Sequence, residues 1–272
     1  MYTLISSPDN LRTAVQHVRE KYPLLRDRTW FDTNLDEKLD NLGNELAAGT
    51  FKPARISLFY TLLDKPLRCA EMDCRSWVAH EAIVGPLVDY LTKNVVESCT
   101  FRPENTPDLM AACRRWKKKN AWVAGADIRR FFDSVRYPVL MEVLAGEIPC
   151  ATTLKLIAHF LETFDQASSE FAATESTHTY HPNQGLPAGI ELVYILANAL
   201  LTPTDRNLKT LADGYYARYI DDFLFFAPEA AVLRGVMHEL ESALARLGLT
   251  LNPEKTFFQP TTTPFHFLRS IV

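Results

Sequence analysis

The sequence lacks the features that mark several large classes of protein. Its five cysteines are an odd number, lie far apart and include no C-x-x-C pair, which argues against a disulfide framework or a common zinc site. The most apolar run, residues 192–201, is too short to cross a bilayer, and the N-terminus does not resemble a signal peptide. Free thiols and the lack of a membrane segment predict a cytoplasmic protein with no membrane partner.

The chain also has no internal repeat and no excess of basic charge. Its formal net charge is −4 at pH 7, so binding of nucleic acid would depend on a local basic patch. One such patch is Arg114-Arg-Trp-Lys-Lys-Lys119, at the end of a helix predicted to begin at Pro107. These cations could hold a nucleic-acid backbone, or they could only complement the helix dipole. The sequence does not decide between the two.

The order of predicted elements indicates an α+β protein. With 272 residues, 47% of them hydrophobic, the chain can form one large domain or two smaller ones. Helical patterns come first, and strands mixed with helices follow. The predicted helices include residues 9–22, 34–48, 73–91, 152–164 and 190–201; residues 166–183 are predicted to form a polar loop, and residues 121–127 and 265–272 to form strands.

Two adjacent carboxylates, Asp221 and Asp222, lie between two short runs of β-branched and aromatic residues. Such runs predict two strands, with a tight turn at the polar pair. Neighbouring carboxylates repel each other unless a cation lies beside them, and Mg²⁺ commonly takes one or two carboxylates together with substrate phosphates. Taken alone, the pair would more often be an exposed acidic turn than a metal site.

A third carboxylate, Asp127, ends a predicted apolar strand well upstream of this pair. Three such groups could clamp two metal ions, which activate an attacking hydroxyl and stabilise the leaving oxygen in an in-line phosphoryl transfer. In such a site the protein mainly positions the reactants and neutralises charge.

Several segments occur in the order of the motifs of reverse transcriptases. The palm motifs are matched by Asp127-Ile-Arg-Arg-Phe-Phe-Asp-Ser-Val135, Gln184-Gly-Leu-Pro-Ala-Gly189 with Leu196-Ala-Asn198, Tyr219-Ile-Asp-Asp222, Leu251-Asn-Pro-Glu-Lys-Thr256 and Phe265-His-Phe-Leu268. The fingers motifs are matched by Gly49-Thr-Phe-Lys-Pro53, Lys65-Pro-Leu-Arg68 and Ser98-Cys-Thr-Phe-Arg-Pro103. From about residue 30 onward, the chain resembles a bacterial reverse transcriptase of the broad group that includes group II intron, retron and phage-defence enzymes.

This resemblance implies the fingers and palm of a right-hand polymerase, with a small antiparallel palm sheet flanked by helices. Residues 1–120 would form N-terminal helices and fingers, and residues 121–272 the palm, with fingers residues interleaved around 136–185. Only four residues follow the last palm motif, so no thumb is expected within this sequence. The sequence could be part of a longer chain, the enzyme could make short or unusual products, or a protein partner or self-association could supply the thumb function. The last of these is the favoured expectation.

The resemblance also implies the catalytic centre. Asp127 and Asp221 would be the main ligands of two Mg²⁺ ions, and the carbonyl of Ile128 would complete one site. Asp222 would be a weaker ligand of the same site, and Mn²⁺ could replace Mg²⁺.

Further roles follow from the same resemblance, with simpler alternatives beside them. Phe132 would block a ribose 2′-OH and favour dNTPs, although either Phe131 or Phe132 belongs to the core. Lys255 would lie near the pyrophosphate as a general acid, or could be an ordinary surface lysine. The other implied dNTP contacts are Lys65, Arg68, Arg129 and Gly189, and the implied primer and template contacts are Tyr219, Phe267 and Leu268. Lys65 and Arg68 could instead form a solvated turn, and Phe267 and Leu268 a buried edge strand.

The implied activity is RNA-directed synthesis of DNA from dNTPs, with a role in anti-phage defence by analogy alone. Two departures from the motifs bear on templating. Ala188 replaces the usual glutamine that contacts the incoming nucleotide and the template, and Val193-Tyr194 replaces a usual Ser-Pro. Untemplated or unusually templated synthesis is therefore an alternative, as is an inactive palm that serves as a nucleic-acid-binding or assembly module. The bulk of Phe132 argues against a viral-type RNA polymerase.

Overall fold

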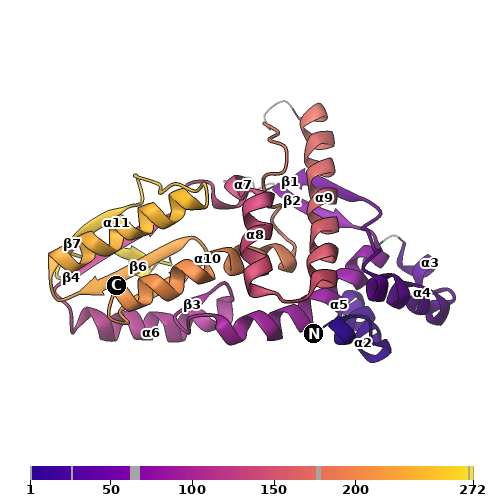
Figure 1. Ribbon diagram of the computed structural model, residues 1–272, viewed down its shortest axis with the longest axis horizontal. Helices are drawn as coiled ribbons and strands as arrows, with labels where there is room; N and C mark the ends of the chain where they lie inside the picture. Colours follow the sequence, from indigo (N-terminus) through magenta and orange to yellow (C-terminus); the bar gives the residue numbers. More distant parts are fainter. Residues whose placement is uncertain (1, 26, 62–67, 176–178, 269, 272) are drawn as a thin grey trace. The chain divides into compact units, whose positions relative to one another are not determined.

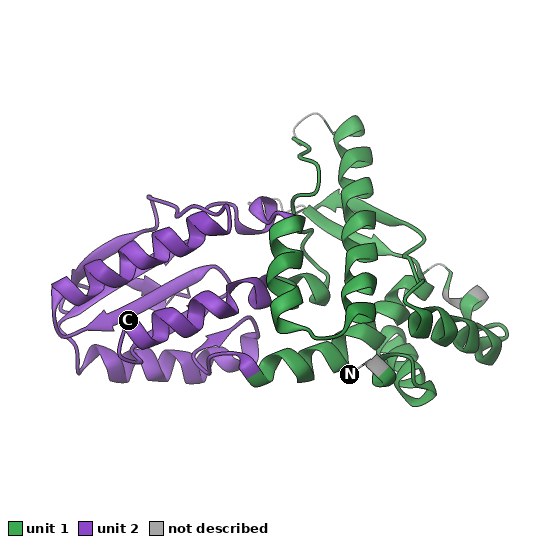
Figure 2. Ribbon diagram, in the orientation of Figure 1, with its two compact units in different colours: residues 1–93, 137–196 green, residues 94–136, 197–272 purple. Residues whose placement is uncertain are grey.

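The computed structural model describes residues 2–25, 27–61, 68–175, 179–268 and 270–271. The chain forms two units, each built from two separate segments (Figure 2). Unit 1 contains Met1–Lys93 and Tyr137–Leu196, and unit 2 contains Asn94–Arg136 and Ala197–Val272. Lys65, one of the cations expected to bind a triphosphate, lies outside the described residues.

Unit 1 is mainly helical, and several of its helices begin or end at the residues that the sequence predicts. The Ser7 side chain accepts a hydrogen bond from the backbone N–H of Asn10 and so caps the second helix. Gly49, with φ of 63°, ends the fourth. The helices of this unit (Figure 1) are α1 (Tyr2–Ile5), α2 (Pro8–Lys21), α3 (Arg28–Asp32), α4 (Leu35–Ala48), α5 (Cys74–Leu91), α8 (Tyr137–Glu147) and α9 (Ala151–Thr174).

A two-stranded antiparallel sheet completes unit 1. It consists of β1 (Ile56–Tyr60) and β2 (Arg68–Met72). Ala188 lies alongside β2: its N–H donates to the carbonyl of Arg68 at 2.8 Å, and its own carbonyl accepts from the N–H of Ala70 at 3.2 Å. This pairing fixes the backbone of Ala188 against β2 and places Gly189 directly after it.

Unit 2 is built around a five-stranded sheet with the strand order β3-β5-β6-β4-β7. Neighbouring strands are antiparallel except for β3, which is parallel to β5. The elements of this unit are β3 (Cys99–Thr100), η2 (Pro103–Asn105), α6 (Thr106–Lys117), β4 (Trp122–Asp127), α7 (Phe131–Ser134), β5 (Tyr216–Tyr219), β6 (Asp222–Ala227), α11 (Ala230–Arg246), β7 (Phe257–Pro260), β8 (His266–Phe267) and β9 (Ser270–Ile271). The single turn η1 (Thr92–Asn94) and α10 (Glu191–Leu211) contribute residues to both units.

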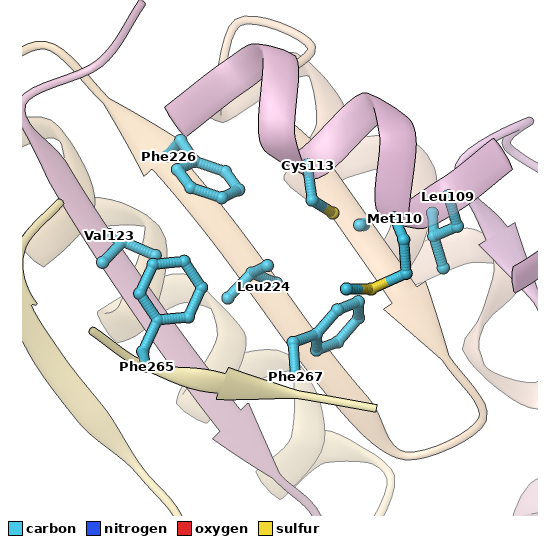
Figure 3. Packing of buried hydrophobic residues seen from close by; sticks show 9 residues of the cluster. Leu109, Met110, Cys113, Val123, Leu224, Phe226, Phe265 and Phe267 are labelled. Carbon is cyan, nitrogen blue, oxygen red and sulfur yellow. The ribbon is translucent and has the colours of Figure 1, made fainter. Parts of the chain in front are cut away.

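The core of unit 2 lies on both faces of this sheet. On one face, α6 packs against β5, and its residues Leu109, Met110 and Cys113 share one apolar cluster with residues of β4, β5 and β6. Phe265 and Phe267 belong to the same cluster (Figure 3). Because side chains alternate along a strand, Phe223 and Phe225 of β6 point to the opposite face, where their rings stack near Tyr216. Helix α11 packs against β4 and β6.

Three predicted elements differ from the structure. Helix α9 continues to Thr174 through part of the predicted polar loop, because Phe171 packs edge-on against Tyr60 and Ser168 is buried. Helix α10 continues past Pro203 to Leu211. The predicted terminal strand is instead the antiparallel pair β8 and β9.

Helices and mainly antiparallel sheets together confirm the predicted α+β class. All five cysteines are free thiols. Within the described ranges, no helix combines the length and the apolar character needed to cross a membrane.

Candidate active site

The three predicted carboxylates meet at one end of the central strands of unit 2. Asp127 is the last residue of β4 and lies directly opposite Asp222, the first residue of β6. Asp221 occupies the two-residue turn between β5 and β6, together with Ile220. The predicted turn at Asp221 and Asp222 is therefore displaced by one residue. Asp127 is buried, with 4% of its surface exposed, and the other two carboxylates are half-buried.

The turn holds Ile220 in an unfavourable conformation. Its φ of 57° lies in the left-handed region, which β-branched residues rarely adopt. Two hydrogen bonds fix this residue: its N–H donates to the carbonyl of Thr100 at 3.0 Å, and its carbonyl accepts from Arg218 Nη1 at 2.8 Å. A third bond, from the N–H of Ile128 to the carbonyl of Asp221 at 3.2 Å, ties the turn to the end of β4. Surrounding contacts thus stabilise a strained turn, as is common at functional sites.

Arg218 connects this turn to α10. Its guanidinium is fully buried, with Nε 2.8 Å from Asp205 Oδ1 and Nη2 3.0 Å from Asn198 Oδ1. The hydroxyl of Tyr216 donates to the same Asp205 carboxylate at 2.6 Å. A buried ion pair is tolerated when further hydrogen bonds satisfy its polar atoms, as they do here. Sequence reasoning did not identify Asp205, because Pro203 suggested that the helix had already ended.

Negative charge is concentrated at the three carboxylates. Burial and the neighbouring Asp127 carboxylate raise the pKa of Asp221 to about 6. Burial, followed by the charges of Asp221 and Asp127, also raises the pKa of Asp222. Burial and, after it, the neighbouring negative charges thus disfavour the ionised forms of both carboxyl groups.

Lys255 offsets part of this charge. Its Nζ lies 2.6 Å from Asp127 Oδ2, and this hydrogen bond, opposed by burial, raises the pKa of Lys255. Asn252 also binds Asp127, through both its backbone and its side chain. Its N–H donates to the Asp127 carbonyl at 2.7 Å, and its Nδ2 lies 3.3 Å from Asp127 Oδ1. The segment that carries Lys255 is thereby attached to the end of β4.

The donor set suits a hard divalent cation, although no ready-made site is present. Among the described residues, no group of three or more His, Cys, Asp or Glu side chains is arranged so that it could hold a metal ion as it stands. The Lys255 ammonium already bonds to Asp127. Carboxylate oxygens are nevertheless the ligands that Mg²⁺ and Mn²⁺ prefer. A cation beside Asp221 and Asp222 would relieve the repulsion that raises the pKa of each.

Four other predicted residues of unit 2 differ in their exposure to solvent. Phe131 belongs to the core, whereas the adjacent Phe132 is half-buried, with ring centroids 5.4 Å apart. The Arg129 side chain is exposed, and its N–H donates to the carbonyl of Thr250 at 2.9 Å. Phe267 is buried in the core cluster, as the simpler alternative for this residue predicted.

Tyr219 and Leu268 line a cavity of about 670 Å³ that reaches Asp222. Its other lining residues are Pro103, Thr106, Pro107, Met110, Arg114 and Ser270. The cavity thus lies next to one of the three carboxylates, wholly within unit 2.

Two further predicted residues belong to unit 1. Arg68 begins β2 and is buried, and its Nη1 donates to Ser168 Oγ at 3.2 Å, so it does not lie on a solvated turn. Gly189 is exposed with φ of 87°, a conformation that favours glycine.

A helix-covered antiparallel sheet with carboxylates at the ends of two adjacent strands is typical of the palm of a nucleic-acid polymerase. The family model described as "Reverse transcriptase (RNA-dependent DNA polymerase)" matches residues 66–271. The chain belongs to the reverse transcriptase family.

Individual relatives are more distant. The chain is 36% identical over 73 residues to the Gag-Pro-Pol polyprotein of Human T-cell leukemia virus 3, a match that covers 27% of this chain and 5% of the polyprotein. The structure of apo telomerase from Candida tropicalis is similar with a TM-score of 0.57 and 13% identity, covering 87% of this chain and 51% of the telomerase. Telomerase from Candida albicans, in complex with the TWJ fragment of telomeric RNA, gives a TM-score of 0.54 and 13% identity over 81% of this chain and 45% of that one. The chain thus spans about half the length of these telomerases, and their likeness concerns the fold.

Proposed function

We propose that this chain is a reverse-transcriptase-type DNA polymerase, which adds dNTPs to a 3′ end by two-metal phosphoryl transfer on an RNA template. The observation that carries the proposal is the convergence of three carboxylates. Asp127 lies opposite Asp222 across two paired strands, and Asp221 is held beside them on a strained turn. A turn fixed by hydrogen bonds from both sides keeps Asp221 in place before any substrate binds, which favours catalysis.

The proposed metal ligands are Asp127, Asp221, Asp222 and the carbonyl of Ile128. Bound there, Mg²⁺ or Mn²⁺ supplies charge neutralisation and an activated hydroxyl for the in-line displacement. Asn252 orients the Asp127 carboxylate. In this structure Lys255 Nζ lies 2.6 Å from Asp127 Oδ2. During the reaction Lys255 moves away from that carboxylate and donates a proton to the departing pyrophosphate.

In the same proposal, unit 1 acts as the fingers and unit 2 as the palm. This assignment differs from the bounds that the resemblance implies, because residues 94–120 pass from the fingers to the palm and residues 186–196 from the palm to the fingers. The dNTP contacts are Lys65, Arg68, Arg129 and Gly189, and Phe132 selects against the ribose 2′-OH. The half-buried position of Phe132 beside the buried Phe131 supports this choice, because a fully buried ring could not meet a nucleotide. Tyr219, Phe267 and Leu268 position the primer and template. The bacterial origin, a protein partner or self-association, and a role in anti-phage defence stay predictions from the resemblance.

Ala188 favours one variant of the activity, synthesis with loose or no templating. Its methyl group is buried and its backbone is paired with β2, so its side chain offers no hydrogen bond to a template base. The experiment that tests the main proposal also distinguishes untemplated synthesis from RNA-templated synthesis.

The test is extension of a labelled DNA primer by the full-length chain with Mg²⁺ and all four dNTPs, on an RNA template, on a DNA template and without a template. Asp221→Ala reports whether synthesis depends on the carboxylates, and Asp40→Ala, an exposed carboxylate of α4, is the matched control. We expect RNA-directed extension by wild type and Asp40→Ala that is lost in Asp221→Ala. Equal extension without template would establish the untemplated variant, and no extension by wild type would support an inactive palm.

A further inference from the structure

One face of α6 forms the floor of the cavity beside Asp222. Pro107, Met110 and Arg114 line it, and these residues follow one another at intervals of three and four. With 3.6 residues per turn, such residues share one face of a helix. Lys118, four residues after Arg114 and still in helical conformation, continues the same face.

Both cations on this face are available to a ligand. The side chains of Arg114 and Lys118 are exposed. In the part of the chain that the structure describes, neither takes part in an ion pair with an acidic group. Lys117, which follows on the edge of this face, lies with its Nζ 5.5 Å from the centre of the Phe265 ring.

The lining of this cavity combines apolar, polar and charged side chains. Pro103, Pro107, Met110 and Leu268 supply apolar surface, and Arg114 contributes a cation. Asp222 lies on the same lining. A polynucleotide strand has matching chemistry, because its sugars and base edges can rest on apolar surface while its phosphates require cations.

We propose that Arg114 and Lys118 bind successive phosphates of the DNA strand whose 3′ end lies at Asp222. This inference rests on the proposed function for the identity of the strand, because the reacting 3′ end must lie at the carboxylates. According to this inference, the basic residues at the end of α6 bind nucleic acid and do not only complement the helix dipole. The overall charge of −4 would otherwise oppose such binding, so a local cationic track is needed.

Two neighbouring cations outside this face provide a matched control. Arg115 and Lys119 are also exposed. Arg115 lies about 100° around α6 from Arg114, and Lys119 follows the C-cap residue Lys118. The pairs Arg114→Ala with Lys118→Ala and Arg115→Ala with Lys119→Ala remove the same residue types. Both reduce the positive charge at the helix end equally, so a dipole effect acts on both.

The test measures binding of a fluorescent RNA–DNA hybrid with a recessed DNA 3′ end to the full-length chain, without dNTP, over a range of NaCl concentrations. Loss of two phosphate contacts makes the negative slope of log K against log salt concentration shallower by about 1.4 to 1.8. We expect this change, with weaker binding, in the Arg114/Lys118 variant and not in the Arg115/Lys119 variant. Equal slopes for wild type and both variants, equal weakening by both variants, or no binding by wild type would overturn the inference.

A second arm identifies the strand. Methylphosphonates, which carry no charge, replace phosphates near the 3′ end of the DNA strand or at the paired positions of the RNA strand. We expect substitution in the DNA strand to weaken binding by wild type but to have little effect on the Arg114/Lys118 variant. If methylphosphonates in the RNA strand, and not those in the DNA strand, weaken binding by wild type, the assignment of the two phosphates to the DNA strand is wrong.

Failure of this inference and failure of the proposed function give different results. If wild type extends primers but the two double variants bind alike, the inference fails and the polymerase remains. If binding depends on Arg114 and Lys118 but the wild type extends no primer, the two phosphate contacts stand, the placement of a reacting 3′ end at Asp222 fails with the proposed function, and the chain is a nucleic-acid-binding module. Circular dichroism of each variant shows whether α6 is still folded.

Discussion

The Lys255 ammonium lies 2.6 Å from the carboxylate of Asp127, the residue that we propose as a metal ligand. In the proposed function, a divalent cation would therefore compete with the lysine for Asp127 Oδ2. Either positive charge offsets the carboxylate charges that, together with burial, raise the pKa values of Asp221 and Asp222. The lysine would then stabilise the metal-free site and be released when cation and substrate bind.

Replacement of Lys255 by methionine is expected to strengthen metal binding and to slow catalysis. Removal of a positive charge from the site should tighten Mn²⁺ binding about tenfold, because two like-signed charges a few ångströms apart near a protein surface repel by more than about 1 kcal/mol. Loss of a general acid should lower the single-turnover rate by about 100-fold. Titration calorimetry and rapid-quench kinetics measure the two effects, with Lys93→Met, at an exposed lysine of unit 1, as the control. Weaker Mn²⁺ binding in Lys255→Met would contradict the competition.

Asp222→Asn is expected to stabilise the metal-free chain. The raised pKa of Asp222 shows that its ionised form is disfavoured in the folded state, so stability falls as the pH rises from the ordinary aspartate range. At pH 7.5 the variant should gain about 1 kcal/mol in free energy of unfolding, a figure that allows for partial solvent screening. The gain should vanish under acidic conditions, in which the wild-type carboxylate is protonated. Urea unfolding with and without Mg²⁺ measures this gain, and the control variant Asp40→Asn should show no change in stability. A loss of stability in Asp222→Asn would contradict the claim that ionised Asp222 destabilises the folded chain.

Arg218 is expected to be required for both the fold of unit 2 and the geometry of the turn. Arg218→Met leaves the buried Asp205 carboxylate without its cation and removes the bond to the Ile220 carbonyl. Breaking a buried pair in this way costs about 3 to 5 kcal/mol. Adding Asp205→Leu to this variant should recover part of that loss, because no buried charge then remains. Denaturant unfolding measures both; an Arg218→Met variant as stable as the exposed control Arg234→Met would show that the network is dispensable.

In unit 1, Glu81 is expected to stabilise the fold in a pH-dependent way. This buried carboxylate lies 3.1 Å from Lys21 Nζ and 3.4 Å from Nδ1 of His80, whose Nε2 accepts a hydrogen bond from the N–H of Leu192 at 3.1 Å. Burial alone would raise the pKa of Glu81, but His80 and Lys21 together lower it below its ordinary value.

A lowered pKa in the folded state means that ionised Glu81 adds stability at neutral pH, and that this stability is lost as the pH falls through the folded pKa. Glu81→Gln should therefore destabilise the chain at pH 7 by about 1 to 3 kcal/mol. The difference from wild type should shrink below the ordinary glutamate value of 4.5. Unfolding curves across this range test the prediction beside Glu71→Gln, at an exposed strand position. A pH-independent difference would contradict it.

The sequence predicted elements whose signals are local. Ser7 and Asp73 begin helices, Gly49 ends one, and the apolar run before Asp127 forms a buried strand. These features depend on capping side chains and on periodicity, both of which can be read within a few residues. The sequence predicted that Asp127, Asp221 and Asp222 form one site. It did not predict the pairing of Asp127 with Asp222 across β4 and β6, since spacing alone does not determine strand order.

The parts that could not be predicted depend on distant partners. Helix α10 extends past Pro203 because its C-terminal half presents Asp205 to the buried Arg218, a contact that no local pattern reveals. Helix α9 extends over Ser168 and Phe171, where tertiary packing outweighs the polar composition. The contact between Lys255 and Asp127 is likewise absent from any local pattern, because it links segments far apart in the chain.

The measurement that tests the central claim most directly is the single-turnover rate of one dNTP addition to a primer on an RNA template with saturating Mg²⁺, for wild type and Asp127→Asn. The amide has the size of the carboxylate but carries no charge and binds a divalent cation poorly. We expect the rate to fall roughly a thousandfold or more, equivalent to about 4 kcal/mol of lost transition-state stabilisation. Circular dichroism should show an unchanged fold. A folded Asp127→Asn variant that incorporates dNTP at the wild-type rate would mean that the chemistry does not occur at these carboxylates.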